Sequence, residues 1–242
     1  MERIVLKFGG TSLANIEKIL SVSRIVQQKH KNGGEIIVVV SAMSGVTNDL
    51  IGKSKKISSN FEKAELDTLL SSGEQASSAL LAAAIVKLGI KSRSWLSWQI
   101  PILTEGNFGS SRIVHVETKK INNFIKSGGI PIIPGFQGIS KDFRLTTLER
   151  GGSDASAVAI AKFFQADHCE IFTDVDGVYT TDPNINTKAK KIDKISYDEM
   201  LEMSSLGAKV MQPNSIQTAM IYDIPIYVRS TFSNNEGTQI VS

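Results

Sequence analysis

The amino-acid sequence predicts an α/β fold in which helices cover both faces of a largely parallel sheet. Strand-like runs such as "EIIVVV" alternate along the chain with segments whose apolar residues recur at helical spacing. These runs are also continuously apolar, which is typical of parallel strands buried on both faces. With 242 residues and 41% hydrophobic content, the chain is long enough to form the core that such a sheet needs.

The elements are expected in the following order. A strand at residues 3–8, a helix at about 11–30 and a strand at 35–40 form a first βαβ unit. After them we expect a helix at about 74–88, a strand at 92–98, a helix at about 116–127, a strand at 130–134, a hairpin, a helix from residue 153, a strand at 168–175, two helical segments after residue 196 and a strand at 224–231. Ligands bind at the carboxyl ends of strands in such sheets, where "KFGGTS", "SAMSGVTND", "GFQG" and "TDVDGVYTTDP" are expected.

The composition argues against several functional classes. The formal charge of +3 is spread along the chain, so no nucleic-acid partner is expected. One cysteine and three scattered histidines indicate neither a disulfide framework nor a metal-ligand cluster. The N-terminus has no apolar signal region, and the longest apolar run, "ALLAAAIV", is too short for a membrane span. A cytoplasmic protein with no membrane partner is therefore expected.

Two glycine-containing segments have the features of ligand sites. In "KFGGTS", Lys7 supplies a charge, Gly9 and Gly10 let backbone N–H groups approach an anion, and the next residues can start a helix. A lysine before an ordinary glycine turn is the alternative. In "ERGGSD", Arg150 and Asp154 are four residues apart where a helix is expected to begin, and a capped helix after a turn is the alternative.

Five motifs, in order along almost the whole chain, resemble the catalytic domain of aspartokinases: "KFGGTS", "SSGEQ", "TTLxRGGSD", "FTDVDGVYTTDP" and "GAKVMQP". The resemblance implies the amino acid kinase fold, a three-layer αβα sandwich with a mainly parallel central sheet. One domain would span residues 1–242, with an amino-acid-binding lobe at about 1–145 and a nucleotide-binding lobe at about 146–242. The resemblance also implies a homodimer.

The activity implied by the resemblance is transfer of the γ-phosphoryl group of ATP, with Mg²⁺, to the side-chain carboxylate of L-aspartate. This is the first step of lysine (diaminopimelate), threonine and methionine biosynthesis. A carboxylate with a pKa of about 3.9 is ionised at neutral pH, so the nucleophile needs no general base. The chemistry requires alignment of the reactants and neutralisation of phosphate charge.

The resemblance also assigns roles to individual residues. The catalytic residues would be Lys7 and Lys209, which hold the phosphates from two sides, and Asp154, which orients both ammonium groups. The aspartate would be held by Ser41, Thr47, Glu74, Arg150 and Ser153, with the Arg150 guanidinium on the α-carboxylate. The nucleotide would contact Lys7, Gly9, Gly10, Thr173, Asp174, Tyr179, Asp182, Lys209 and Val210. No protein ligand for a metal is assigned.

Glu74 has two interpretations. At the expected start of a helix it would be a capping residue favoured by the helix dipole. In a site otherwise built for anions, its charge would be costly without a cation. The ammonium group of a free amino acid is such a cation.

The chain departs from the usual family pattern at three places. Glu149 replaces a common glycine, Asn184 replaces a usual arginine, and "QPN" at 212–214 replaces "HPR". Glu149 can alter the backbone or pair with Arg150 and weaken substrate binding. The chain also ends where aspartokinases usually continue into ACT domains, so neither an ACT domain nor inhibition by lysine or threonine is expected. An acetylglutamate or glutamate kinase-like enzyme and a catalytically weakened nucleotide-binding subunit are the alternatives.

Overall fold

The computed structural model describes residues 2–149, 151–183, 185–208, 210–233 and 235–242. Its centre is an eight-stranded sheet in the order β12-β14-β13-β9-β1-β2-β6-β3. Neighbouring strands are parallel except β13 and β14, which pair antiparallel. The mainly parallel sheet expected from the sequence is therefore confirmed. Its strands are β1 (Arg3–Phe8), β2 (Glu35–Val40), β3 (Ser92–Ser94), β6 (Ile130–Pro134), β9 (His168–Thr173), β12 (Lys194–Ser196), β13 (Ile226–Ser230) and β14 (Thr238–Val241).

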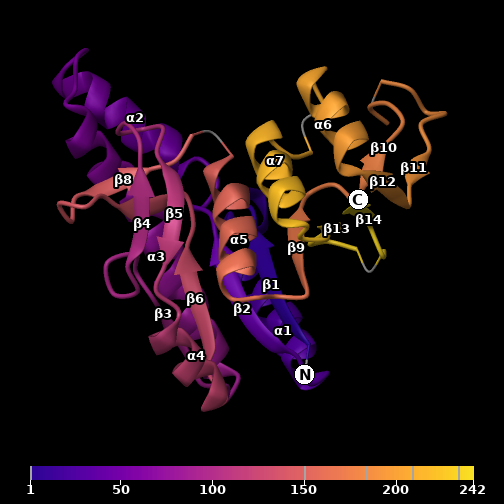
Figure 1. Cartoon of the computed structure of the whole chain (residues 1–242), viewed down its shortest axis with the longest axis horizontal. Coiled ribbons are helices and arrows are strands. Elements are labelled where there is room, and N and C mark those ends of the chain that lie inside the picture. Colours follow the sequence, from indigo (N-terminus) through magenta and orange to yellow (C-terminus); the bar gives the residue numbers. More distant parts are fainter. Residues whose placement is uncertain (1, 150, 184, 209, 234) are drawn as a thin grey trace.

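Helices cover both faces of this sheet and complete a three-layer sandwich. The alternation of side chains along β1 fixes the two faces. Ile4, Leu6 and Phe8 pack with the buried residues of α1 (Ile16–Lys31) and α3 (Lys63–Lys87). Val5 faces the opposite cluster, which includes α5 (Gly152–Phe163) and α7 (Pro213–Tyr222). Figure 1 shows α5 lying across the front of the central strands.

Smaller elements flank the sandwich. A four-stranded sheet in the order β5-β4-β7-β8 and a two-stranded sheet of β10 and β11 lie outside the main sheet. These and the remaining helices are η1 (Gly10–Leu13), α2 (Val46–Ile57), β4 (Ile102–Glu105), β5 (Arg112–Val116), α4 (Lys119–Lys126), β7 (Gln137–Ile139), β8 (Leu145–Thr147), β10 (Val178–Tyr179), β11 (Lys191–Ile192) and α6 (Tyr197–Ser205).

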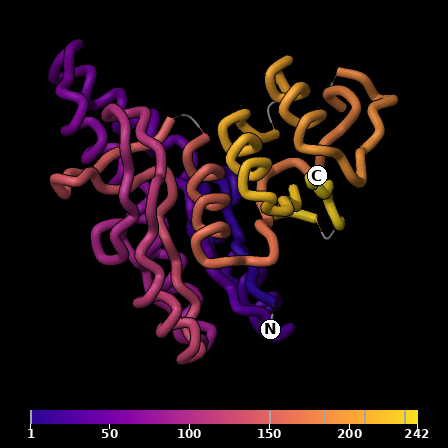
Figure 2. Tube along the Cα trace, viewed as in Figure 1, coloured from indigo at the N-terminus to yellow at the C-terminus, as the bar shows by residue number. Residues whose placement is uncertain are grey.

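The N-terminal strand β1 lies in the middle of the main sheet. β1 pairs with β2 on one side and with β9 on the other. Figure 2 shows the indigo N-terminal strands between the magenta segment and the orange-to-yellow C-terminal segment. The carboxyl ends of β9, β1, β2 and β6 therefore lie side by side at one edge of the sheet, as the sequence predicted for the four polar segments.

Several predicted boundaries were wrong. The helix expected from residue 11 begins at Ile16, after the short 3₁₀ helix η1, because the Asn15 side chain accepts from the Lys18 N–H and caps it. The helix expected from residue 74 begins at Lys63, where Glu62 is the cap. The helix expected from residue 116 begins at Lys119, because Val116 ends β5.

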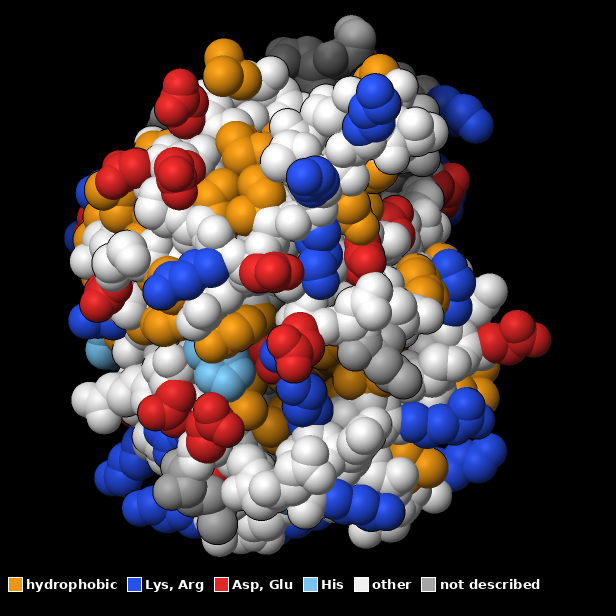
Figure 3. Space-filling model, turned by 90° about the vertical axis from the view of Figure 1, so that its right-hand side faces the viewer, with side chains coloured by type: hydrophobic (Ala, Val, Ile, Leu, Met, Phe, Trp, Pro, Cys, Tyr) orange, Lys and Arg blue, Asp and Glu red, His pale blue; other side chains and the backbone are white. Residues whose placement is uncertain are grey.

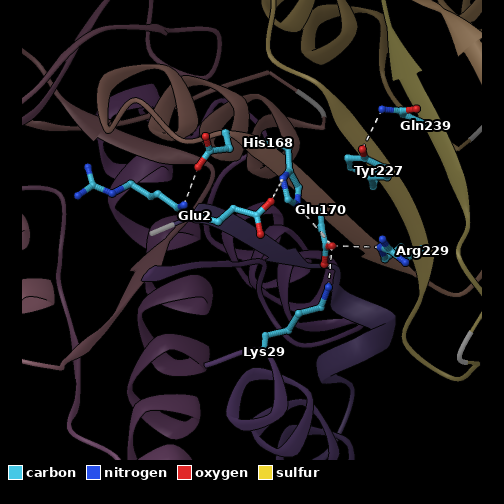
Figure 4. A network of polar contacts seen from close by, with 9 residues as sticks. Glu2, Lys29, His168, Glu170, Tyr227, Arg229 and Gln239 are labelled. Atoms are coloured by element: carbon cyan, nitrogen blue, oxygen red, sulfur yellow. Dashed lines mark hydrogen bonds and ion pairs between the residues drawn. The ribbon is translucent and has the colours of Figure 1, made fainter. Parts of the chain in front are cut away.

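A cluster of charged side chains around the buried Glu170 joins β9 to α1 and to β13. Glu170, only 1% exposed, receives the Lys29 ammonium of α1 at 2.7 Å and the Arg229 guanidinium of β13 at 3.2 Å (Figure 4). His168 lies between Glu170 and Glu2. Burial alone would raise the pKa of Glu170, but the hydrogen bonds from His168 and Lys29 outweigh it and the pKa lies below its usual value. The cluster thus holds α1 against this strand.

Surface charge and apolar helices bear on possible partners. On the face shown in Figure 3, Lys and Arg side chains are scattered and interspersed with Asp and Glu. Among the described residues, α3 is long and apolar enough by length and composition to cross a membrane, contrary to the expectation from the longest apolar run. However, 56% of its most apolar 18-residue stretch is buried inside the protein, and buried core helices often have this length and composition. The length and composition of α3 are therefore weak evidence for a membrane span.

Candidate active site

A cavity of about 750 Å³ opens at the carboxyl ends of β1 and β2, between these strands, α2, α3 and the start of α5. It brings together most of the residues that the resemblance assigned to the amino acid and to the transferred phosphate. The predicted site residues that line it are Lys7, Gly10, Ser41, Thr47, Glu74, Ser153 and Asp154.

Lys7 and Asp154 form an ion pair at the floor of this cavity. The Lys7 Nζ lies 2.6 Å from Asp154 Oδ1, and each residue is only 8% exposed. Lys7 is held by β1, whereas Asp154 lies in the first turn of α5. The ammonium group is therefore fixed at the point where the sheet edge meets a helix N-terminus, and the positive end of the helix dipole adds to its charge.

Close backbone contacts explain two of the glycines in the motifs. A Cβ at Gly10 would lie 2.9 Å from the Ala42 carbonyl oxygen, so the loop after β1 can interlock with the loop after β2 only at a glycine. A Cβ at Gly73 would lie 2.9 Å from Ala42 Cβ, which lets α3 approach the same loop. By contrast, the Gly9 N–H donates to the Phe172 carbonyl at 3.1 Å. The Gly9 N–H is thus used within the sheet, and the role of Gly9 as a nucleotide contact stays a prediction.

Glu74 projects from the interior of α3 into the cavity. It lies eleven residues beyond the first residue of that helix, Lys63, so the capping interpretation is wrong. Its Oε1 accepts from the Ala42 N–H at 3.0 Å, whereas its Oε2 is buried without a partner in the described structure. Burial raises the pKa of Glu74 to about 7, and the Ala42 hydrogen bond only partly opposes this. Among the described residues, no cation meets this carboxyl group.

Asp67 is a cavity residue that the sequence reasoning missed. It is 1% exposed and accepts three hydrogen bonds, from the Thr147 N–H at 2.7 Å, the Thr147 hydroxyl at 2.7 Å and the Gly109 N–H at 3.0 Å. Asp67 precedes Glu74 by seven residues on α3, so the two lie on one helix face. Extending the predicted helix toward its true start would have revealed this spacing.

We expect Asp67→Asn to lower the free energy of unfolding by about 1–3 kcal/mol, the scale of buried donors left without an acceptor. An amide has only one acceptor oxygen, so the three donors cannot all be satisfied. Urea denaturation measures the change, and Asp49→Asn is the matched control because Asp49 is exposed on α2. A stability equal to that of the control would contradict this structural role.

Two helix N-termini face the cavity. Thr47 lies in the first turn of α2, and Ser153 lies in the first turn of α5. Each helix begins after a glycine with positive φ, Gly45 at 85° and Gly151 at 79°, a conformation that side chains rarely adopt. Helix N-termini favour anions, so hydroxyl groups and positive dipole ends converge on the same space.

Lys7 and Gly10 line this cavity, but most of the other residues assigned to the nucleotide do not. Thr173, Asp174, Tyr179, Asp182 and Val210 do not line it. Thr173 ends β9, adjacent to the Phe8–Gly9 end of β1, and its hydroxyl donates to Asp174. The Tyr179 side chain is half-buried, and its hydroxyl donates to Asp176. Thr173 and Asp174 therefore border the same end of the sheet, one strand away from Lys7.

Some predicted residues lie outside the described part of the chain. These are Arg150 and Lys209, together with Asn184 among the departures from the family pattern. Glu149, however, is described, and its Oε2 accepts from the Asn214 side-chain amide at 2.6 Å. Two of the departures from the family pattern therefore contact each other. Among the described residues, no group of three or more His, Cys, Asp or Glu could hold a metal ion.

Sequence comparison identifies the family of this chain. The profile of the amino acid kinase family matches residues 2–230. The chain is 46% identical to the aspartokinase of Bacillus sp. (strain MGA3) over 240 residues, which are 99% of this chain and 58% of that protein. The chain therefore spans less than two thirds of the curated relatives that it matches first.

Solved structures give the same result. The aspartate kinase from Synechocystis superposes with a TM-score of 0.88 at 38% identity, covering 99% of this chain and 40% of that one. E. coli aspartokinase III in complex with aspartate and ADP superposes with a TM-score of 0.89 at 27% identity, covering 100% of this chain and 65% of that one. The expected three-layer αβα fold is thus confirmed.

Proposed function

The chain belongs to the amino acid kinase family, and from that premise we propose that it transfers the γ-phosphoryl group of ATP to the side-chain carboxylate of L-aspartate, giving 4-phospho-L-aspartate. Such an enzyme would supply the first intermediate of lysine, threonine and methionine biosynthesis. The proposal draws on the aspartokinase relatives and on the chemistry of the cavity residues.

The main observation behind the proposal is that, among the described residues, only one of the two oxygens of the Glu74 carboxyl group has a hydrogen-bond partner. One oxygen accepts from the Ala42 N–H, and the other is buried in the cavity wall with no partner in the part of the chain that the structure describes. A buried carboxylate is costly unless a charged or hydrogen-bonding partner meets it. The α-ammonium group of a free amino acid meets this requirement, whereas an acylated amine carries no charge.

The remaining cavity residues suit an acyl phosphate reaction. The Lys7 ammonium, oriented by Asp154, neutralises charge on the transferred phosphoryl group. The aspartate β-carboxylate attacks as an ionised nucleophile, so no general base is needed to activate it. Ser41, Thr47 and Ser153 supply hydroxyl groups around the amino acid, and Arg150 is proposed for its α-carboxylate.

ATP and Mg²⁺ are proposed as the second substrate and its metal. Mg²⁺ needs octahedral oxygen ligands and is often held by substrate phosphates with one or two carboxylates. Asp174, exposed just after the end of β9, fits this donor set, because it is a carboxylate whose Oδ1 accepts from the Thr173 hydroxyl. Thr173, Asp174, Tyr179, Asp182, Lys209 and Val210 remain proposed nucleotide contacts. The metal would complete the neutralisation of phosphate charge that Lys7 begins.

A direct assay tests the proposal. Purified protein is incubated with ATP, Mg²⁺ and each of aspartate, glutamate, N-acetylglutamate and N-acetylaspartate, and ADP release and hydroxamate formation are measured. We expect turnover with aspartate above all others. Preference for an acylated amino acid would favour the acetylglutamate kinase-like alternative, and no turnover with any acceptor would favour the weakened nucleotide-binding subunit.

The organisation beyond the site also stays a prediction. A boundary between two lobes near residue 145 would fall at β8, close to the cavity. A homodimer is proposed from the resemblance, and a cytoplasmic location from the composition. Light scattering of the purified chain would test the dimer.

A further inference from the structure

The segment between β8 and α5 is fixed to two different parts of the protein. At its start, the Thr147 backbone and hydroxyl donate to Asp67 of α3. Two residues later, Glu149 Oε2 accepts from the Asn214 amide in the first turn of α7 at 2.6 Å. We call residues 147–151 the strap.

A second contact joins the strap to the same helix start. Gly151 has a φ of 79°, and a Cβ there would overlap the Gln212 side chain. Gln212 is the N-cap residue of α7. The strap and the start of α7 are thus packed together on both sides of position 150, through Glu149 and through Gly151.

These two segments carry different ligands under the proposed function. The strap contains Arg150, proposed for the aspartate α-carboxylate, and α7 follows Lys209 and Val210, proposed for the nucleotide. The hydrogen bond between the Asn214 amide and the Glu149 carboxylate joins the two segments directly. A hydrogen bond to a charged group is stronger than one between neutral groups. A chain with glycine at position 149 has no side chain with which to make it.

We propose that Glu149 and Asn214 are positioning residues whose hydrogen bond makes aspartate binding and nucleotide binding mutually favourable. A ligand that further restrains the strap also restrains the start of α7 through this hydrogen bond, so the second ligand has less conformational entropy to lose. This coupling is reciprocal, because each ligand changes the affinity of the other by one common factor. The inference rests on the proposed function and concerns how its two sites communicate.

Calorimetric titration of aspartate, with and without saturating AMP-PNP and Mg²⁺, measures the coupling factor. We expect aspartate to bind roughly 5- to 10-fold more tightly with the nucleotide present, within the range typical of coupled sites. Glu149→Ala and Asn214→Ala should each reduce this factor below about twofold while leaving the affinity for aspartate alone within about twofold. Combining them should cause no further loss, as expected for two residues that act through one contact.

Three further variants sharpen the test. Glu149→Gln keeps an acceptor oxygen for the Asn214 amide and should retain part of the coupling. Asn214→Asp places two carboxylates face to face and should abolish it without shortening the side chain. Gln217→Ala, an exposed residue one turn further along α7, is the control and should keep the wild-type factor. Melting temperatures should stay within a few degrees throughout, since both partners are exposed.

The outcomes separate this inference from the proposed function. If aspartate does not bind the wild-type protein with or without nucleotide, the proposed function fails. If aspartate binds but the wild-type coupling factor is one, or if the Ala and Asp variants keep the wild-type factor, the role of the Glu149–Asn214 bond is refuted while the proposed function stands.

Discussion

Replacing Lys7 by methionine is expected to lower kcat by at least about 10²- to 10³-fold, the usual cost of losing one preorganised charge donor at a transition state. Methionine keeps most of the length of the lysine side chain but cannot neutralise the transferred phosphoryl group. ADP release with saturating aspartate and ATP measures the effect.

Stability needs a separate control, because Lys7 has a structural partner. The single variant leaves Asp154 buried without its cation, and breaking one side of a buried ion pair costs about 3–5 kcal/mol. The double variant Lys7→Met/Asp154→Leu replaces both charges by apolar groups of similar size. Such replacements are often neutral or stabilising.

The pair of variants distinguishes catalysis from folding. We expect the melting temperature to fall in the single variant, to recover in the double variant, and the turnover to stay low in both. Recovery of turnover together with stability in the double variant would mean that the Lys7–Asp154 pair serves only the fold.

The inner strands β1, β2 and β6 of the central sheet were the most predictable part of the fold, whereas its strands β12 and β14 were not predicted. The predicted limits of β1, β2 and β6 agree with the structure, since continuous apolar runs bounded by charged, glycine or proline residues define a buried parallel strand without help from distant contacts. The short strands β4 and β5 and the helix α2 were not predicted. Each is only partly buried, so its apolar pattern is weak.

The start of α3 was missed for a functional reason. Along the part of this helix that was not predicted, the buried face carries Asp67, Ser71 and Gly73 where a core helix would carry apolar residues, and only Ala64 and Leu70 are apolar there. Asp67 lines the cavity and Gly73 packs on the Ala42 loop beside it, and both interrupt the helical spacing of apolar residues. The same residues that build the site therefore conceal the helix that holds them.

Several residues that line the cavity were named from the sequence, but the contacts between them were not. The motifs named Lys7, Thr47, Glu74, Ser153 and Asp154, which the structure brings to one cavity. Motif matching could not reveal that Asp67 anchors the strap, because that contact joins α3 to a residue far along the chain. Nor could it reveal the Glu149–Asn214 bond, since departures from a family pattern do not show which residues they meet.

Replacing Glu74 by glutamine is expected to weaken apparent aspartate affinity about 10- to 100-fold at pH 8. The loss corresponds to about 1.5–3 kcal/mol, the worth of a hydrogen bond to a charged group. Glutamine keeps the shape and an acceptor for the Ala42 N–H but cannot carry the charge that meets a substrate ammonium group. ATP affinity should scarcely change. Steady-state kinetics with each substrate varied in turn gives both values.

The pKa of Glu74 makes the prediction depend on pH. With a pKa of about 7 in the folded protein, Glu74 is protonated at pH 6 and ionised at pH 8. Wild-type affinity for aspartate should therefore fall as the pH is lowered through about 7, and aspartate binding near that pH should release a proton. The Glu74→Gln variant has no such group, so its affinity should be flat over the same range.

Stability should respond in the opposite direction. A carboxyl group whose pKa is raised on folding binds its proton more tightly in the folded state, so its contribution to stability is full below about pH 4.5 and is lost as the pH rises to about 7. The ligand-free wild type should therefore lose stability relative to Glu74→Gln across this window, measured by urea denaturation at each pH. Adding aspartate should restore the wild type above pH 7.

Two controls decide the interpretation of these results. Glu65→Gln alters an exposed glutamate on the same helix and should leave aspartate affinity and its pH profile unchanged. N-acetylaspartate, which lacks the ammonium group, should be a poorer substrate than aspartate for the wild type but should lose that disadvantage in Glu74→Gln. If the variant instead keeps wild-type aspartate kinetics at pH 8, Glu74 only holds the Ala42 loop, and the case for a free amino acid as the substrate rests on the family relatives.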